Sequence, residues 1–254
     1  MIESNCAQPL HLTGTHGARV VETLQLRQIR VAVEQAAEVQ GIVVVYGDVG
    51  LGKTFSVDLA CRSLPRPVYW VDMPNRPKGR EAVARVFEAV SGRRVNLRRR
   101  GYMLLYDVQD LLTDRACILV VDEAQNMSKE SLRQLRYLHD RAETKFVLAL
   151  LGYGVEKVLR AEVPELASRV CRWVGCRPIP LQALGDVISS YHPIFAATGS
   201  EVRARLYQAA GGNFRTWGRI LEVALSLDLS ETSGIGPEDV DDVLAALGPR
   251  GGGA

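Results

Sequence analysis

The chain has 254 residues, 47% of them hydrophobic and 24% charged, and its formal net charge is +2 at pH 7. This composition is typical of a globular, soluble chain that buries one large core, or a large and a small one. No apolar run approaches the roughly 20 residues that span a bilayer, and the first residues do not resemble a signal peptide, so we expect neither a membrane protein nor an exported one. Charges of both signs are interspersed, which excludes a uniformly basic chain and requires any polyanion site to be local.

Cysteine usage favours a reducing compartment. The cysteines are odd in number and lack CxxC spacing, so we expect reduced, mostly buried thiols and a cytoplasmic protein. Cys171 and Cys176 could form half of a metal site, but no histidine or second cysteine pair accompanies them. The five residues are Cys6, Cys61, Cys117, Cys171 and Cys176.

Apolar spacing in the first two thirds of the chain alternates between helix and strand patterns. Residues 20–39 carry apolar side chains at helical spacing, and after Gly41 a β-branched run predicts a strand buried on both faces. Alternation of strands with amphipathic helices predicts an α/β fold with a mostly parallel, five-stranded sheet. The strand patterns lie at residues 42–47, 67–72, 117–122 and 145–151.

The last third of the chain has helical patterns only, which predicts a small helical domain after the sheet. We therefore expect a leading segment and helix, an α/β domain, a helical lid domain and a tail that is flexible by composition. The expected helices lie at residues 184–197, 200–210, 215–228 and 237–247. The expected boundaries are residues 1–40, 41–182, 183–247 and 248–254.

The first strand continues directly into GDVGLGKT, which fits G-x4-G-K-[ST] and stands between a strand and a helix. The glycines let the backbone curl around phosphates, so that N–H groups and the start of the next helix face the anion. Lys53 is expected to reach the β- and γ-phosphates, and the Thr54 hydroxyl to bind Mg²⁺. The predicted ATP-binding residues are Gly47, Asp48, Val49, Gly50, Leu51, Gly52, Lys53 and Thr54.

A later apolar strand ends in ILVVDEAQ, which supplies the carboxylates that such a loop needs. Asp122 is expected to hold Mg²⁺ through water, and Glu123 to polarise the attacking water. Phosphoryl transfer depends mainly on positioning and on neutralising the developing charge, so a carboxylate pair at a strand end suits the reaction. A helix cap at Asp122 and an ordinary surface glutamate at Glu123 are the structural alternatives.

Helicases, small-molecule kinases and AAA+ ATPases share these two motifs, and the remainder of the chain discriminates between them. A DEAQ-type helicase needs two tandem cores, which about 250 residues do not hold, and a small-molecule kinase does not normally add a separate helical domain. The stretch GGNFRTWGRIL at 211–221 resembles the sensor-2 segment of AAA+ ATPases. This resemblance implies that Arg215 touches the γ-phosphate from the small domain.

A closer resemblance covers roughly residues 17–247. VVDEAQNMSKESLRQLRYLHD, FVLALLGYG and PELASRVCRWVGCRPIPL, followed by the sensor-2 segment, look like the AAA+ regulators of transposition of the TnsC, TniB and MuB group and their ExeA-type relatives. The resemblance implies an arginine that reaches the nucleotide of the next subunit, with Arg169 the first candidate and Arg172 the second. Hydrolysis would then depend on assembly.

Two departures from the family pattern are visible in the sequence. A small polar sensor residue usually follows the glycine that ends the fourth strand, whereas this chain has Gly152 and Tyr153 there. Only about forty residues precede the first strand, so we expect no counterpart of the DNA-binding domain of MuB. The compact TnsC and TniB types therefore fit better.

Two basic stretches are candidates for contact with DNA. RRVNLRRR occupies residues 93–100, and the loop NRPKGR precedes it. In the regulators that the chain resembles, this region lines a channel around DNA, and arginine forks suit phosphates. The alternative is a solvated loop in an arginine-rich chain. The predicted DNA-binding residues are Arg76, Lys78, Arg80, Arg93, Arg94, Arg98, Arg99 and Arg100.

Taken together, the motifs and the resemblance predict an ATPase that uses ATP and Mg²⁺ and assembles as a ring or filament on double-stranded DNA with little sequence preference. It would present that assembly to a transposase, with or without a target-selector protein, and hydrolysis would disassemble it. The alternatives are a protein-directed ATPase of the ExeA secretion type and a switch that loads a helicase. The predicted catalytic residues are Lys53, Glu123, Arg169 and Arg215.

Overall fold

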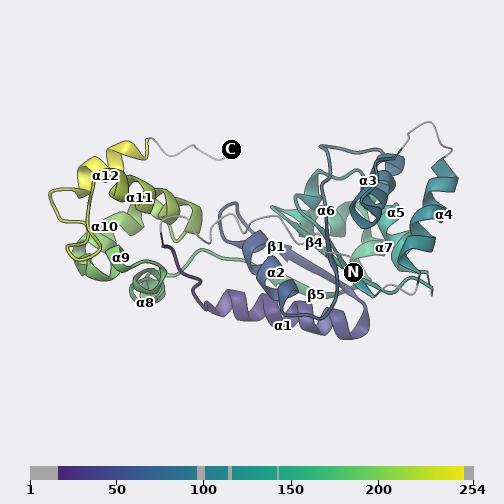
Figure 1. Cartoon of the computed structure of the whole chain (residues 1–254), viewed down its shortest axis with the longest axis horizontal. Coiled ribbons are helices and arrows are strands. Elements are labelled where there is room, and N and C mark those ends of the chain that lie inside the picture. The colour runs from purple at the N-terminus through teal and green to yellow at the C-terminus, as the bar shows by residue number, and fades with distance from the viewer. Residues whose placement is uncertain (1–16, 96–100, 114–115, 142, 249–254) are drawn as a thin grey trace. The chain divides into compact units, whose positions relative to one another are not determined.

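The computed structural model describes residues 17–95, 101–113, 116–141 and 143–248. The described chain divides into two compact units (Figure 1). Unit 1 contains residues 25–48 and 53–176, and unit 2 contains residues 17–24, 49–52 and 177–248. Within the described ranges, every helix is too short or too polar to cross a bilayer.

Unit 1 is built on a five-stranded sheet in the order β2-β3-β4-β1-β5, with parallel pairing between all neighbours. This confirms the α/β class and the parallel five-stranded sheet that the sequence predicts. The strands are β1 (Ile42–Tyr46), β2 (Val68–Val71), β3 (Cys117–Val121), β4 (Phe146–Gly152) and β5 (Val170–Gly175).

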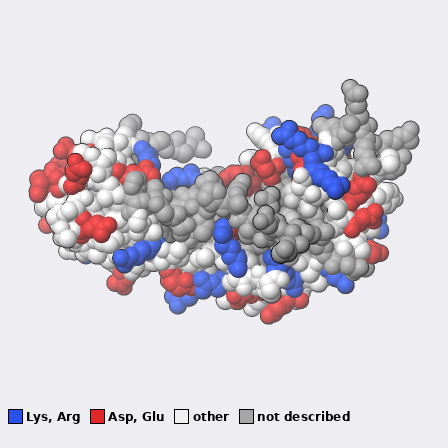
Figure 2. All heavy atoms as spheres, in the orientation of Figure 1, with Lys and Arg blue, Asp and Glu red and all other residues white. Residues whose placement is uncertain are grey.

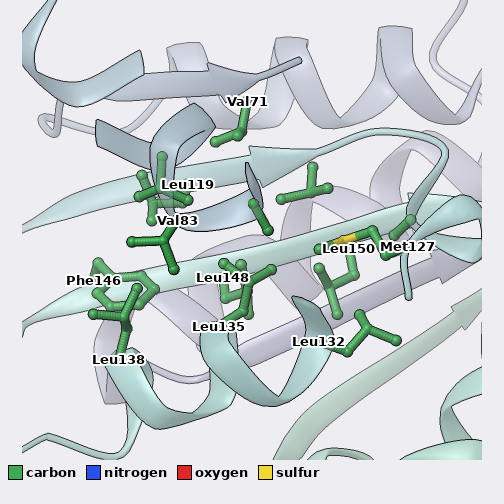
Figure 3. Packing of buried hydrophobic residues seen from close by; sticks show 14 of the residues in the cluster. Val71, Val83, Leu119, Met127, Leu132, Leu135, Leu138, Phe146, Leu148 and Leu150 are labelled. Carbon is green, nitrogen blue, oxygen red and sulfur yellow. The ribbon is translucent and has the colours of Figure 1, made fainter. Parts of the chain in front are cut away.

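The central strands are buried on both faces, which explains why their sequences are nearly continuous runs of branched apolar residues. Alternate residues of β1, β3 and β4 contribute to one large core cluster, to which α5 adds Leu132, Leu135 and Leu138. Figure 3 shows these leucines directed toward Phe146, Leu148 and Leu150 of β4. The register of the sheet is therefore fixed by packing and not by the backbone alone.

The helices of unit 1 connect successive strands. α5 begins after Ser128, whose hydroxyl accepts the Ser131 N–H at 3.2 Å, and ends at His139. The helices are α1 (Leu24–Val39), α2 (Lys53–Arg62), α3 (Gly79–Ser91), α4 (Gly101–Leu112), η1 (Ala124–Asn126), α5 (Lys129–His139), α6 (Val155–Glu162) and α7 (Pro164–Ala167). In α1 the predicted apolar stripe is only partly buried, because Leu24 and Val31 are exposed and alanines complete the buried face.

Parallel pairing gives the sheet two chemically different edges. The carboxyl edge is where the strands end, with Tyr46 of β1 beside Gly152 of β4 and Val121 of β3 beside Leu150. The amino edge is where the strands begin, with Ile42 beside Val170. Because α5 follows β3 and precedes β4, it runs from the carboxyl edge back to the amino edge.

Unit 2 is helical around a core that contains Trp217 and Phe195, whose rings meet edge to face at 5.2 Å. The predicted helix at 184–197 is divided at His192, because that residue is extended before Pro193 and caps the following helix with its Nδ1. The helices are α8 (Leu181–Tyr191), α9 (Pro193–Ala197), α10 (Ser200–Ala210), α11 (Phe214–Ser226) and α12 (Val240–Ala246).

Candidate nucleotide-binding site

The glycine-rich turn follows β1 at the carboxyl edge and leads into α2. The Lys53 ammonium donates to the carbonyl oxygens of Gly47 and Asp48, each at 2.8 Å, and the lysine is 8% exposed. Gly47, Gly50 and Gly52 all have positive φ angles, which glycine adopts without strain. The turn therefore has the backbone form and the cation that a phosphate cradle requires.

Thr54 and Asp122 meet at this edge although 68 residues separate them in sequence. The Thr54 hydroxyl donates to Asp122 Oδ2 at 2.6 Å. A hydroxyl and a carboxylate are oxygen ligands of the kind that Mg²⁺ takes beside phosphates. The chemistry of these two side chains suits a magnesium ion, and the metal itself stays a prediction.

Glu123 follows Asp122 in a left-handed backbone conformation, with φ 52° and ψ 35°. Its N–H donates to Asp122 Oδ1 at 2.8 Å, and its exposed carboxylate accepts from the Gln125 amide. Left-handed conformations in non-glycine residues are uncommon and gather at functional sites. The neighbouring carboxylates thus have different surroundings, with Asp122 held by the Thr54 hydroxyl and Glu123 exposed.

Tyr153, at the position where the sequence left the sensor in doubt, is 56% exposed. The side chain that lies against the end of β4 is instead Gln125, because a Cβ added to Gly152 would collide with its Oε1. Sequence reasoning missed Gln125 as a site residue. The only signal was its place in DEAQ, two residues after Glu123.

Cys176 is also at this edge, where its N–H donates to Tyr46 O at 2.6 Å. Burial raises the pKa of its thiol to about 11, and the nearby Lys53 lowers it by less. Burial likewise raises the pKa of Cys171. Protonated thiols are poor metal ligands, and within the described ranges no group of three or more His, Cys, Asp and Glu side chains could hold a metal ion.

Unit 2 contains the middle of the glycine-rich turn together with the predicted sensor-2 segment. The Asn213 amide donates to Val49 O at 2.7 Å, and the Arg215 N–H lies 3.3 Å from Gly50 O. Asn213 also caps α11 by accepting from the Arg215 and Thr216 N–H groups. The Arg215 side chain is exposed, and Asn213 is a contact residue that the sequence analysis did not single out.

Arg169 and Arg172 lie at the amino edge, on or beside the start of β5. Arg169 Nε is 3.2 Å from Asp140 Oδ1, just past the end of α5, while Arg172 donates to the Gln35 side chain of α1. Both arginines therefore lie at the edge of the sheet opposite the one that holds Lys53 and the glycine-rich turn.

The predicted DNA-binding residues fall into two groups at opposite ends of α3. Arg76 and Lys78 are exposed on the connection between β2 and α3, and Arg80 is exposed in the first turn of α3. The connection is anchored because Ser131 Oγ donates to Pro77 O at 2.7 Å and the Arg76 N–H to Asn126 O at 2.9 Å. Figure 2 shows Lys and Arg side chains gathered on the part of unit 1 where the connection between β2 and α3 lies.

The second group comprises Arg93 and Arg94, which are exposed just after α3 ends. Since α3 has 13 residues, the two groups are about 20 Å apart along it. Arg98, Arg99 and Arg100 lie outside the described residues.

Comparison with known families matches residues 36–159 to the family described as an AAA domain. No curated protein matches this chain in sequence. Structural similarity supports the same fold. ORC2 of Aeropyrum pernix in ADPNP–ADP complexes aligns with a TM-score of 0.64 at 12% identity, over 87% of this chain and 66% of that chain.

ORC1 of Aeropyrum pernix in complex with DNA aligns with a TM-score of 0.65 at 19% identity, over 88% of this chain and 64% of that chain. Cdc6p from Pyrobaculum aerophilum gives 0.65 at 17% identity, over 89% of this chain and 68% of that chain. The chain therefore spans about two thirds of the length of these proteins, and at such identities the similarity is one of fold.

Proposed function

We propose that this protein is an ATPase of the AAA+ type that binds ATP with Mg²⁺ and hydrolyses it. The observation that carries the proposal is the convergence, at the carboxyl edge, of the Lys53 turn, the Thr54–Asp122 pair and Glu123. The AAA domain match over residues 36–159 and the similarity to ORC2, solved with nucleotides, support it.

Each of these residues has a separate task in the proposed reaction. Lys53 and the N–H groups of the turn bind phosphate oxygens, and Thr54 and Asp122 hold the metal ion. The bound Mg²⁺ supplies charge that offsets the negative charge developing on the phosphates. Glu123 accepts the proton of the attacking water, and Arg215 contacts the γ-phosphate.

The Glu123→Gln variant tests this assignment. Loss of a general base typically slows hydrolysis by roughly 10²- to 10⁴-fold, whereas ATP affinity should stay unchanged because the phosphate contacts remain. Glu201→Gln, the same change at an exposed residue in the first turn of α10, is the matched control. Turnover by Glu123→Gln at the parental rate would contradict the role of this residue as the base.

We further propose that the protein assembles into homo-oligomers on double-stranded DNA when ATP is bound. The anchored loop with Arg76 and Lys78 and the first turn of α3 with Arg80 present three cations, and Arg93 and Arg94 add two more just past the end of that helix. A few phosphate contacts per subunit become strong binding when several subunits follow one duplex. The solved complex of ORC1 with DNA supports DNA as the polyanion.

A salt series on random duplex DNA, with a slowly hydrolysed ATP analogue, tests the DNA proposal. For each monomer, Arg76→Ala/Lys78→Ala should reduce the slope of log affinity against log salt by about two, because each phosphate contact contributes about 0.9. Arg205→Ala/Arg219→Ala removes the same charge from exposed positions of unit 2. An equal effect of both pairs would show general attraction instead of a binding surface.

The biological role that we propose is regulation of transposition, in which the assembly marks target DNA for a transposase, with or without a target-selector protein, and hydrolysis removes it. The resemblance of the segments around Asp122 and Arg169 to TnsC- and TniB-type proteins supports this role. It requires binding with little sequence preference. Competition between many duplex sequences should therefore give affinity ratios close to one.

A second role is favoured by the similarity to ORC1 and Cdc6p. A replication initiator or helicase-loading switch would use the same ATP site but a different partner. Specific DNA-binding proteins typically prefer their sites by roughly 10³-fold or more over other DNA. A preference of that size in the same competition would favour the initiator role, and co-purification of a replicative helicase would favour the loader.

A further inference from the structure

The turn that carries Glu123 is closed by hydrogen bonds within five residues. The Asn126 N–H donates to Glu123 O at 2.9 Å, and the Met127 N–H to Ala124 O at 3.1 Å. Asn126 O in turn accepts the Arg76 N–H at 2.9 Å. The backbone that positions the side chains of Glu123 and Gln125 is therefore held firmly, while the Glu123 side chain itself is exposed.

Gln125 makes the hydrogen bond that restrains this exposed carboxylate. Its Nε2 donates to Glu123 Oε2. An ionised carboxylate only accepts hydrogen bonds, so the amide must face Glu123 with its nitrogen and point its oxygen away. The orientation of the Gln125 amide is thus set by the charge of Glu123.

The Gln125 oxygen is then directed against the end of β4. Its Oε1 is buried and has no hydrogen-bond partner among the described residues. A Cβ on Gly152 would overlap it, although Gly152 has an ordinary backbone conformation that other residues adopt. Glycine at 152 is therefore needed here for the space that it leaves to Gln125. A buried acceptor without a partner costs stability, and such a cost is typical of side chains that are held for function.

We propose that Gln125 is a positioning residue for ATP hydrolysis, which holds the Glu123 carboxylate in place while Gly152 provides the space that its amide occupies. The proposal rests on the proposed ATPase function, in which Glu123 is the base. A long exposed side chain samples several rotamers, and only the one directed at the water is productive. The hydrogen bond from Gln125 removes that freedom. It also places a polar group at the end of β4, where Tyr153 is directed to solvent.

The test combines Gln125→Ala, Gly152→Ala and the double variant. Gln125→Ala should lower kcat by roughly 10- to 100-fold, the range seen when a partner that orients a functional group is removed, with the affinity for ATP unchanged within about twofold. Gly152→Ala should produce the same loss because its methyl group displaces the amide. In the Gln125→Ala background Gly152→Ala should have no further effect on kcat, since the space is then free.

Gly185→Ala is the matched control, because a Cβ at Gly185 meets no atom within 4 Å and the residue lies in α8. The inference is overturned by parental turnover or faster turnover in Gln125→Ala, by losses that multiply in the double variant, or by a changed ATP affinity that accounts for the loss. Failure of the proposed ATPase function is distinct, since the parental chain itself would then hydrolyse no ATP.

Thermal unfolding of the same variants tests the inference without measuring catalysis. Gly152→Ala should lower the midpoint of thermal unfolding in the parental background but not in Gln125→Ala, because the overlap disappears with the amide. Equal effects in both backgrounds would show that the two side chains do not compete for this space, and would overturn the inference whatever the hydrolysis rates are.

Discussion

The two edges of the sheet in unit 1 hold their polar side chains in different ways. At the carboxyl edge the glycine-rich turn, the Thr54–Asp122 pair and Glu123 are fixed by short hydrogen bonds and by backbone conformations that few residues adopt. At the amino edge Asp140 pairs with Arg136 of α5, which is half-buried, and with Arg169, which is exposed just before β5. The first arrangement is preorganised for a ligand, while the second consists of surface ion pairs that contribute little to stability.

This difference indicates how the proposed reaction is divided between subunits. The carboxyl edge holds the residues that bind phosphate and metal and activate water, and the amino edge presents Arg169 on the opposite side of the sheet. An arginine held only by an exposed pair can exchange one anion for another. We therefore expect the carboxyl edge to act on the subunit's own nucleotide and the amino edge on that of a neighbour.

Replacing Arg169 by alanine tests this division with the largest expected effect. A trans-acting arginine contributes about 10³-fold or more to the rate of hydrolysis. Arg169→Ala should therefore lower the hydrolysis rate of the assembled protein by that factor, while the isolated chain still binds ATP normally. Steady-state hydrolysis with and without DNA measures it. Asp140→Asn, which leaves the arginine in place, should keep the rate and change stability by less than about 1 kcal/mol.

The same measurement on Arg172→Ala decides between the two candidates. If neither substitution lowers the rate of ATP hydrolysis by the assembled protein, the amino edge takes no part in the reaction of a neighbouring subunit.

Lys53→Ala should lower hydrolysis by about 10²- to 10³-fold, the usual effect of removing one group that stabilises developing charge, and should weaken ATP binding as well. Mixing it with Arg169→Ala sharpens the comparison. A mixed assembly contains junctions with an intact turn from one variant and an intact arginine from the other, so the mixture should hydrolyse faster than either variant alone. A mixture as slow as its components would indicate that both residues act on the nucleotide of their own subunit, which would contradict the division between the edges.

Leu135→Ala tests how much the packing of α5, the helix that runs between the two edges, contributes to the stability of the protein. Leu135 is fully buried between α5 and the sheet, and its truncation should cost about 2–5 kcal/mol of unfolding free energy. Chemical denaturation measures the loss. Leu181→Ala, at a position 52% exposed, should stay within about 0.5 kcal/mol of the parental protein.

The smallest effect expected is a pH dependence at the amino edge. Burial lowers the pKa of His139 from its ordinary value of 6.5, and the ring nitrogen Nε2 contacts Gln40 O at 2.9 Å. The folded protein favours the neutral ring, so the unfolded chain takes up the proton first as pH falls. This contribution to stability is present above about pH 6.5 and lost as pH drops through the pKa of the folded state.

Thermal unfolding across pH 5–8 measures this dependence, and His139→Gln should reduce it, because glutamine has no charge to gain. An unchanged pH profile in that variant would contradict the assignment to His139.

The features predicted correctly from sequence are those in which local sequence determines local structure. The glycine spacing at 47–52 fixes the turn, and the β-branched runs fix the strands, so the parallel sheet follows. The meeting of Thr54 and Asp122 was also predictable, because parallel strands end at one edge and both residues follow such strands.

The features missed depend on how distant elements pack. Gln125 contacts Gly152 only because β3 and β4 are neighbours in the sheet, and a glycine that ends a strand gives no sign of the side chain beside it. The exposure of Leu24 and Val31 was missed for a related reason. Alanines at 32, 36 and 37 are buried while Leu24 and Val31 are exposed, so the buried face of α1 does not coincide with the apolar stripe that the sequence suggests.

The length of α5 has a consequence for any assembly that this protein forms. Its 11 residues separate the turn of Glu123 from Asp140, the partner of Arg169, by about 16 Å. If Arg169 contacts the ATP of the adjacent subunit, the length of this helix contributes to the spacing between successive ATP sites. One inserted residue would lengthen it by about 1.5 Å and turn its end by about 100°, which changes the pitch of a filament without altering any residue that contacts ATP or DNA.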